Sequence, residues 1–318
     1  MPAVSAFLVP GSPLPLLRGD EPPYRPLRRA LDEVAGRLAD SRPDVLLVYS
    51  TRWIAVLDAL WQTRPRLDGV HVDEVWHDLG DLPHDLRVDT DLAHACVAAT
   101  NAMGLRAKGV DFEAFPVDTG AVVANALLNA GERPIPLVIA ANNIYHDGPT
   151  TERLGALALS QAEHQGKRAA ALAIGGLSTE FHRAEIDLSD DHISDPAKDE
   201  LNRRLFDLLA GGDTDAIRAF LPEFSDRARG DQHMKHLWWL LGASGGVQGA
   251  TLQAYGPDYG SGAAVMEFTT VSEQAVETPR PGATAVAPGA NRGAPVWQAA
   301  MRPGRRRAAA RSWSRPSP

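Results

Sequence analysis

The segment Pro43–Trp53 constrains the fold of this chain more than any other. Within it, Val45–Val48 is an unbroken apolar run that follows a proline and leads into small polar residues. A short apolar run without alternation is typical of a strand buried on both faces, as in the middle of a parallel sheet. Apolar residues at helical spacing precede it in Pro26–Leu38. A helix followed by such a strand predicts an α/β fold, in which ligands bind beyond the carboxyl ends of the strands.

Apolar strands that end in small or polar residues recur along the chain. Val4–Val9, Pro136–Ala141 and Lys167–Ile174 have this form, and Ala263–Phe268 is predicted as a last strand. After Trp53, and before the next helix at 89–103, we expect a helical turn at 54–61, an edge strand at 69–72 and a loop at 76–83. Further helices are expected at 89–103, 120–128, 151–164, 195–209, 214–220 and 233–241. The alternation predicts one domain with a mostly parallel central sheet flanked by helices.

The composition sets the domain boundaries. The chain has 318 residues, 44% of them hydrophobic, which is enough for one large core. From Val271 onward it is rich in Pro, Ala and Arg and has few aliphatic residues. Such a segment cannot bury a core. We therefore expect a folded domain at 1–270 and a disordered tail at 271–318.

The charge and the cysteine count exclude several classes of protein. The net charge is −8, and the last 48 residues carry eight arginines and two glutamates, which leaves −14 for the rest. So acidic a domain argues against nucleic-acid binding. Cys96 is the only cysteine, so an internal disulfide and a Cys-rich metal site are excluded. No apolar stretch approaches the roughly 20 residues of a membrane span. We expect a soluble, cytoplasmic protein without a membrane partner.

Six segments form an ordered set of motifs along the chain. They are FLVPGSPLPLL at 7–17, DVLLVYSTRW at 44–53, FPVDTG at 115–120, AIGGLST at 173–179, KHLWWLLGA at 235–243 and YGPDYGSG at 255–262. Taken together, these segments resemble the LigB-like family of class III extradiol ring-cleavage dioxygenases. The resemblance spans about Ala3–Phe268 and depends on the order and spacing of the motifs, since no single one is decisive. The resemblance implies a LigB-like, phosphorylase-like core.

The residues that carry chemistry in this family are replaced here. Active members hold one Fe(II) with two His and one Glu, which leaves coordination positions open for substrate and O₂. Gly11 and Arg52 stand at the two His positions, and the segment 231–234 has no Glu. Thr119 replaces the His of an Asp-His-Gly motif, and Thr179 replaces the acid/base His. A permanently charged guanidinium repels Fe(II) rather than binding it.

The resemblance and its departures together imply a non-catalytic, α-type subunit of a ring-cleavage dioxygenase. Such a chain would hold no cofactor and would assemble with a catalytic β-type subunit of the same fold that holds the Fe(II). The complex would act on a small aromatic substrate, 2-aminophenol or a related catechol. The vestigial pocket would be formed by Gly11, Ser12, Ser50, Thr51, Arg52, Trp53, Asp118, Thr119, Tyr145, His146, Ser178, Thr179 and His182.

Other interpretations remain open from sequence alone. A surrogate metal site would use histidines, namely His146, His182, His233 and His236. An enzyme with a rebuilt active site would use Arg52 and Tyr145 together with His146 and His182. A stand-alone protein would use Arg52 to bind a small aromatic or anionic ligand. Trp238 and Trp239 are interpreted as core or interface anchors. We expect their helix to have one exposed face, which could contact a partner protein.

Overall fold

The computed structural model describes residues 3–182 and 185–271, so the predicted tail beyond 271 lies outside the described residues. Eight strands form one sheet in the order β6-β3-β7-β2-β8-β1-β10-β9. The four strands β7, β2, β8 and β1 are parallel, as expected, and β10 and β9 extend the sheet antiparallel to β1. The eight are β1 (Ser5–Val9), β2 (Val45–Ala55), β3 (Ala59–Gln62), β6 (Ala107–Val110), β7 (Leu137–Asn143), β8 (Ala169–Ile174), β9 (Val247–Asp258) and β10 (Ser261–Thr270).

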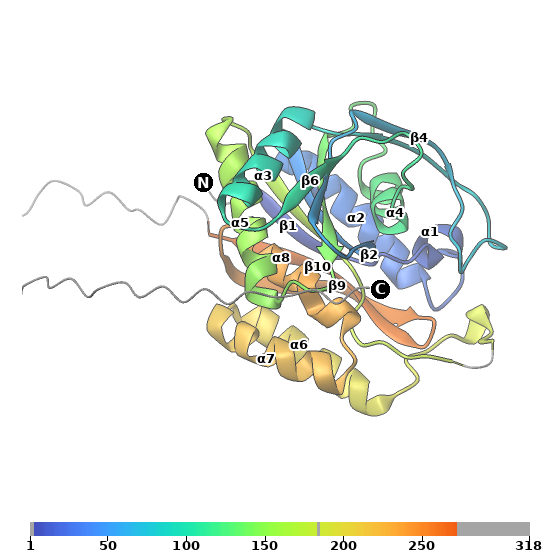
Figure 1. The fold of residues 1–318 in the computed structure, drawn as a ribbon. Helices are drawn as coiled ribbons and strands as arrows, with labels where there is room; N and C mark the ends of the chain where they lie inside the picture. Colours follow the sequence, from blue (N-terminus) through green and yellow to red (C-terminus); the bar gives the residue numbers. More distant parts are fainter. Residues whose placement is uncertain (1–2, 183–184, 272–318) are drawn as a thin grey trace, which may run out of the picture. The chain divides into compact units, whose positions relative to one another are not determined.

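Helices cover both faces of this sheet (Figure 1). Leu47 and Tyr49 of β2 belong to the core beneath α3, α5, α8, α6 and α7, whereas Leu46 and Val48 belong to the core beneath α2 and α4. The central strand is thus buried on both faces, as its apolar run predicts. The helices are α1 (Leu14–Leu17), α2 (Arg25–Ser41), α3 (Thr90–Ala102), α4 (Thr119–Leu128), α5 (Gly148–His164), α6 (Pro196–Gly211), α7 (Thr214–Arg227) and α8 (Lys235–Ala243), with short 3₁₀ turns at Leu188–Asp190 and Asp231–Met234. Over the described residues, no helix has the length and apolarity needed to cross a membrane.

The expected helical turn at 54–61 is wrong. Strand β2 continues through Ala55, with a register shift between Ser50 and Ile54, and β3 follows it. The expected edge strand at 69–72 overlaps β4 (Arg66–His71), which pairs with β5 (Leu82–Arg87) in a separate two-stranded sheet. Residues 51–53 form a bulge at this shift, because the ladder passes directly from the Ser50–Ala141 pair to the Ile54–Asn142 pair. Arg52 and Trp53 therefore lie on the extended strand but outside its ladder.

The packing of α5 against α8 corrects the interface expectation for Trp238 and Trp239. Both tryptophans are buried inside the chain, at 7% and 0% exposure. Glycines let the two helices approach closely: a Cβ at Gly155 would lie 2.3 Å from the Trp239 carbonyl oxygen, and one at Gly242 would lie 1.9 Å from that of Glu152. Real Cβ atoms do not approach carbonyl oxygens so closely. The two tryptophans are therefore core anchors.

Gly242→Ala is expected to lower the free energy of unfolding by about 1–3 kcal/mol, because the added methyl group forces α5 and α8 apart. Gly36→Ala on α2 is the matched control, since nothing lies within 4 Å of its Cβ position. That change should raise stability by about 0.5–1 kcal/mol. Urea unfolding of both variants measures the difference, and an equal effect at the two sites would contradict the close approach.

Candidate functional site

A cleft of about 850 Å³ opens at the carboxyl ends of β1, β2 and β8, where the sequence places it. Its floor and walls come from seven separate parts of the chain, which come together only in the tertiary structure. The lining residues fall in the segments Gly11, 51–54, 71–76, 115–119, 176 with 178–181, 231–232 and 258–262. Of the predicted pocket residues, eight line it: Gly11, Thr51, Arg52, Trp53, Asp118, Thr119, Ser178 and Thr179.

Arg52 and Gly11 occupy one corner of the cleft together. A Cβ at Gly11 would lie 3.3 Å from the Arg52 Nε atom and 3.2 Å from the Ile174 side chain. The arginine stem therefore fills the space into which a longer side chain at position 11 would extend. Arg52 is exposed, and no residue of 3–182 or 185–271 accepts a hydrogen bond from its guanidinium or forms an ion pair with it.

A hydrogen-bonded group of His71, Thr119 and Asp73 forms a second part of the wall. The Thr119 hydroxyl donates to Asp73 Oδ2 over 2.9 Å, and its oxygen lies 2.6 Å from His71 Nε2. Because the single hydroxyl proton goes to Asp73, Nε2 must carry the proton that it donates to Thr119. Burial alone raises the pKa of Asp73. Hydrogen bonds from Trp76 N–H, the Thr119 hydroxyl and Val75 N–H, with the charge of Arg52, outweigh burial and hold that pKa below its ordinary value.

The pKa values of Asp118 and Asp258 are shifted in the opposite direction from that of Asp73. Asp118 caps α4, accepting hydrogen bonds from Gly120 N–H and Ala121 N–H and from the Ser50 hydroxyl. Burial nevertheless raises the pKa of Asp118 above its ordinary value. Burial also raises the pKa of Asp258, despite the nearby Arg52 and Ser12. Both carboxyls therefore take up a proton more readily than an ordinary aspartate does.

The turn Asp231–Met234 forms the cleft floor and leads into α8. Asp231 Oδ2 accepts hydrogen bonds from the Thr51 hydroxyl at 2.6 Å and from Gly176 N–H at 2.8 Å. The next three residues, 232–234, all have positive φ without being glycine. Each such residue costs on the order of 1–3 kcal/mol, a strain that concentrates at functional sites. The strained turn holds Gln232 in the lining, with its Oε1 accepting from Asn142 Nδ2.

This turn also separates the two histidines considered for a surrogate metal site. His233 lies in the left-handed turn and is exposed, whereas His236 lies in α8 and is fully buried. Neither ring nitrogen of His236 has a hydrogen-bond partner among the described residues. The helix expected at 233–241 thus begins only at Lys235, and the two histidines lie on different elements.

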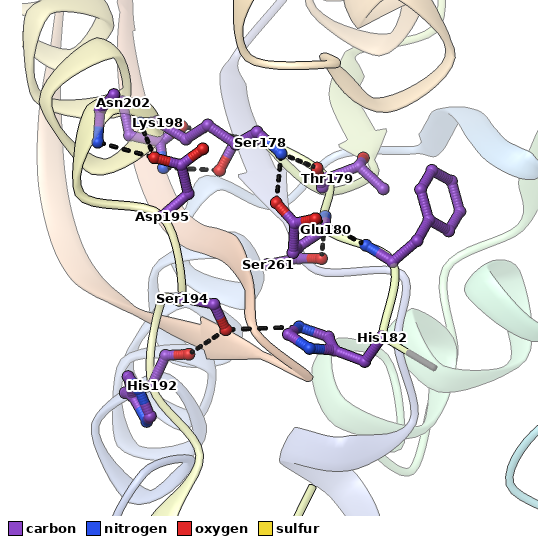
Figure 2. Close-up of polar contacts among 12 residues, drawn as sticks. Ser178, Thr179, Glu180, His182, His192, Ser194, Asp195, Lys198, Asn202 and Ser261 are labelled. Atoms are coloured by element: carbon purple, nitrogen blue, oxygen red, sulfur yellow. Dashed lines mark hydrogen bonds and ion pairs between the residues drawn. The ribbon is translucent and has the colours of Figure 1, made fainter. Parts of the chain in front are cut away.

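The loop 178–181 forms the wall beside α6, and α6 holds it in place. Figure 2 shows Lys198 of α6 reaching this loop, where its Nζ donates to the Thr179 carbonyl oxygen over 2.8 Å and pairs with Glu180. Asn202, also on α6, donates to the Ser178 hydroxyl over 2.9 Å and accepts from Ser178 N–H. The backbone at Thr179 is thus fixed, although threonine supplies no titrating group.

The remaining predicted pocket residues lie away from the lining. Ser12 and Ser50 are buried beneath it. Tyr145 and His146 are on the loop after β7, and His182 contacts Ser194 and Tyr259 at the outer rim (Figure 2). A rebuilt enzyme that uses Tyr145, His146 and His182 is therefore not supported. The predicted pocket left out many lining residues, among them His71, Asp73, Trp76, Gln232 and Phe181, and no motif marked the first three.

The residues at the floor do not fit a divalent iron. Gly11 has no donor atom, Arg52 brings a fixed positive charge, and His236 is enclosed in the core. One carboxylate oxygen of Asp231, Oδ2, already accepts two hydrogen bonds. Within the described part of the chain, no group of three or more His, Cys, Asp or Glu side chains is arranged to hold a metal ion.

Comparison with known proteins identifies the class. The family described as the catalytic LigB subunit of aromatic ring-opening dioxygenase matches residues 11–268, so the chain belongs to the LigB family. The 2-aminophenol 1,6-dioxygenase alpha subunit of a Pseudomonas species is 46% identical over 270 residues, which are 85% of this chain and 100% of that subunit.

Two further proteins are similar over most of their length. The beta subunit of the same Pseudomonas enzyme is 28% identical over 84% of this chain and 94% of its own. A solved structure of an uncharacterised protein of Escherichia coli K12 matches with a TM-score of 0.59 at 15% identity, over 83% of this chain and 99% of that one. At that identity the structural match concerns the fold alone.

Proposed function

We propose that this chain is the non-catalytic, α-type subunit of an extradiol-type dioxygenase complex. The complex opens the ring of 2-aminophenol or a related catechol, and a β-type subunit of the same family holds the Fe(II). The cleft described above is the vestigial counterpart of the active site. In this chain it has no role in oxygen chemistry.

One observation carries this proposal. The cleft is present at the carboxyl edge of the sheet, with its walls held by ordered hydrogen bonds, yet Gly11 and Arg52 occupy its floor in place of metal-binding side chains. A chain that had lost its function altogether has no reason to retain the walls. The 46% identity to an alpha subunit along that subunit's full length supports assembly with a β-type partner.

An exposed apolar patch near the cleft supports assembly as well. We define the patch as Ile54, Val56, Leu57, Ile144 and Tyr145, which are 40–76% exposed. Backbone pairing brings its two halves together, since Ile144 N–H donates to the Ala55 carbonyl oxygen. The buried Lys235 donates to the carbonyl oxygens of Asn143 and Ile144 and fixes the loop. A rigid, exposed apolar patch is typical of a protein interface.

Co-expression with the β-type chain of the same organism is expected to give one stable complex on size exclusion. The double variant Leu57→Asp/Tyr145→Asp should weaken the complex by at least about tenfold, because each change buries a charge at the interface. Leu252→Asp is the matched control, since Leu252 is 41% exposed on β9, at the opposite edge of the sheet. It should leave the complex unchanged.

Two results would count against this proposal. Separate elution of two well-folded chains would contradict the assembly. Loss of the complex in the Leu252 variant, with retention in the Leu57/Tyr145 variant, would contradict the position of the interface. Thermal unfolding of each variant alone confirms that it is folded before the complex is measured.

A further inference from the structure

Two neighbouring residues in the cleft have hydrogen-bond donors without acceptors. Arg52 offers five N–H groups, and no described residue accepts from its guanidinium. Trp53 is only 7% exposed, and its indole N–H also has no partner among the described residues. Both side chains line the cleft. Buried polar groups are nearly always satisfied, so the Trp53 N–H is an unusual buried donor. The exposed Arg52 guanidinium is open to donate to a ligand in the cleft.

Four carboxylates in the cleft, by contrast, already accept hydrogen bonds from the chain itself. Asp73 accepts from Thr119 and from two backbone N–H groups, and Asp118 accepts from Ser50 and two others. Asp231 accepts from Thr51 and Gly176, and Glu180 is paired with Lys198. A ligand that complements this cleft therefore brings acceptors rather than donors.

The walls favour a flat ligand. Five aromatic side chains from separate segments line the cleft: Trp53, Trp76, Phe115, Phe181 and Tyr259. Trp53 meets Phe115 edge to face with ring centres 6.3 Å apart, and Trp76 meets Tyr259 in the same way at 4.9 Å. The volume of about 850 Å³ is that of a small-molecule site.

We propose that this cleft binds a small planar carboxylate, with the acid group on the Arg52 guanidinium and the conjugated body between the aromatic side chains. An arginine guanidinium and a carboxylate form paired, parallel hydrogen bonds. Asp73, Asp118 and Asp258 face the same guanidinium electrostatically and compete with the ligand for it. Asp73 and Asp118 each accept several hydrogen bonds from other groups, whereas Asp258 is hydrogen-bonded to Ser12, so we expect Asp258 to be the main competitor.

Two sources supply this chemistry, an aromatic acid and a ring-opened product. The second rests on the proposed function. When both atoms of O₂ are inserted and the ring bond beside a hydroxyl-bearing carbon breaks, that carbon becomes a carboxylate and its former neighbour becomes an aldehyde. A neutral ring thereby becomes a conjugated anion. In that case the α-type subunit binds the product of its partner.

Isothermal titration of the full-length chain, alone and in the complex, tests the proposal. The probes are benzoate for an aromatic acid and sorbate for an open-chain conjugated acid, with neutral 2-aminophenol and inorganic phosphate as comparisons. At least one carboxylate should bind saturably. Arg52→Gln should weaken that binding about 10- to 100-fold. Asp258→Asn should strengthen it, because a competing charge is removed.

Preference for benzoate assigns the aromatic source, and preference for sorbate assigns the ring-opened one. Equal affinity in the wild-type chain and in Arg52→Gln would overturn the proposal, provided that the thermal midpoints agree. The proposal would also be overturned if phosphate or 2-aminophenol bound as tightly as benzoate and sorbate do. The titrations measure neither assembly nor O₂ uptake. Their failure therefore leaves the proposed subunit role standing, and failure of assembly leaves the titration of the single chain valid.

Discussion

Between pH 6.5 and about 4, the folded chain is expected to lose about 3 kcal/mol of its free energy of unfolding through His236 alone. Burial lowers the pKa of this imidazole to about 4, and the nearby Asp231 offsets burial only in part. In the unfolded chain the same group has its ordinary pKa near 6.5. The unfolded state therefore binds more protons than the folded state throughout this window, so stability falls as the pH falls.

Other groups contribute to the total pH dependence. Partial burial lowers the pKa of His84 and of His146, which adds to the trend. The raised pKa values of Asp118 and Asp258 act in the opposite direction, since these carboxyls take up protons more readily in the folded state. The difference between the wild-type chain and a His236 variant isolates the contribution of His236.

His236→Leu is the informative change, because it removes two unpartnered ring nitrogens from the core. At pH 7.5 the variant should be at least as stable as the wild-type chain, since a buried unpaired polar group is lost. Urea unfolding at pH 7.5, 6.5, 5.5 and 4.5 should show a flatter dependence for it. His94→Gln, at an exposed position on α3, is the control. Parallel curves for wild type and His236→Leu would mean that the buried imidazole does not titrate as inferred.

The parallel part of the fold could be predicted because each strand carries a local signal. Val45–Val48 is apolar without interruption, and the strand is buried on both faces. The extension of β2 through Ala55 was missed, although its alternation is visible in the structure: Thr51, Trp53 and Ala55 are buried, while Arg52 and Ile54 are exposed. The register shift leaves residues 51–53 outside the ladder, and pairing with β7 resumes at Ile54, where a helical turn was expected.

Strand β9 was missed for a different reason. Its Gly, Pro and Tyr content disfavours a strand, yet the turn after Asp258 forms a hairpin with positive φ at Tyr259 and Gly260. Two residues with positive φ form the turn that matches the twist of paired strands. The tyrosine in this turn, unlike an Asn-Gly pair, gives no clear sequence signal. The hairpin places Asp258 and Tyr259 in the cleft.

The cleft itself was predictable in outline but not in detail. The loops that follow β1, β2 and β8 were identified because the carboxyl ends of parallel strands meet at one edge. His71 is the last residue of β4 in the separate two-stranded sheet and Asp73 follows that strand, and only tertiary packing brings them to Thr119. The separation of His233 from His236 depends on three successive left-handed residues. Gln, His and Met rarely adopt that conformation, so no local preference predicts it.

The purified chain alone is expected to bind substoichiometric iron when it is reconstituted anaerobically with Fe(II), and to consume no O₂ with 2-aminophenol or catechol. Arg52 is the main reason. A unit positive charge about 4 Å from the ion costs on the order of 4 kcal/mol for each unit of ion charge, even in a surface-like dielectric. Thr179 also cannot act as an acid or base near neutral pH. An oxygen electrode and iron analysis measure both outcomes, with the co-purified complex as the active control.

Restoring the two imidazoles should not be enough to restore iron binding. Gly11→His alone places its side chain against the Arg52 stem and Ile174. The double variant Gly11→His/Arg52→His removes that contact and the charge, but still lacks an anionic ligand, because Asp231 is engaged by the Thr51 hydroxyl and Gly176 N–H. We expect it to bind iron weakly and to remain inactive. If the wild-type chain alone binds iron tightly and opens a ring, the non-catalytic assignment is wrong, and the floor of the cleft must hold the metal through residues other than Gly11 and Arg52.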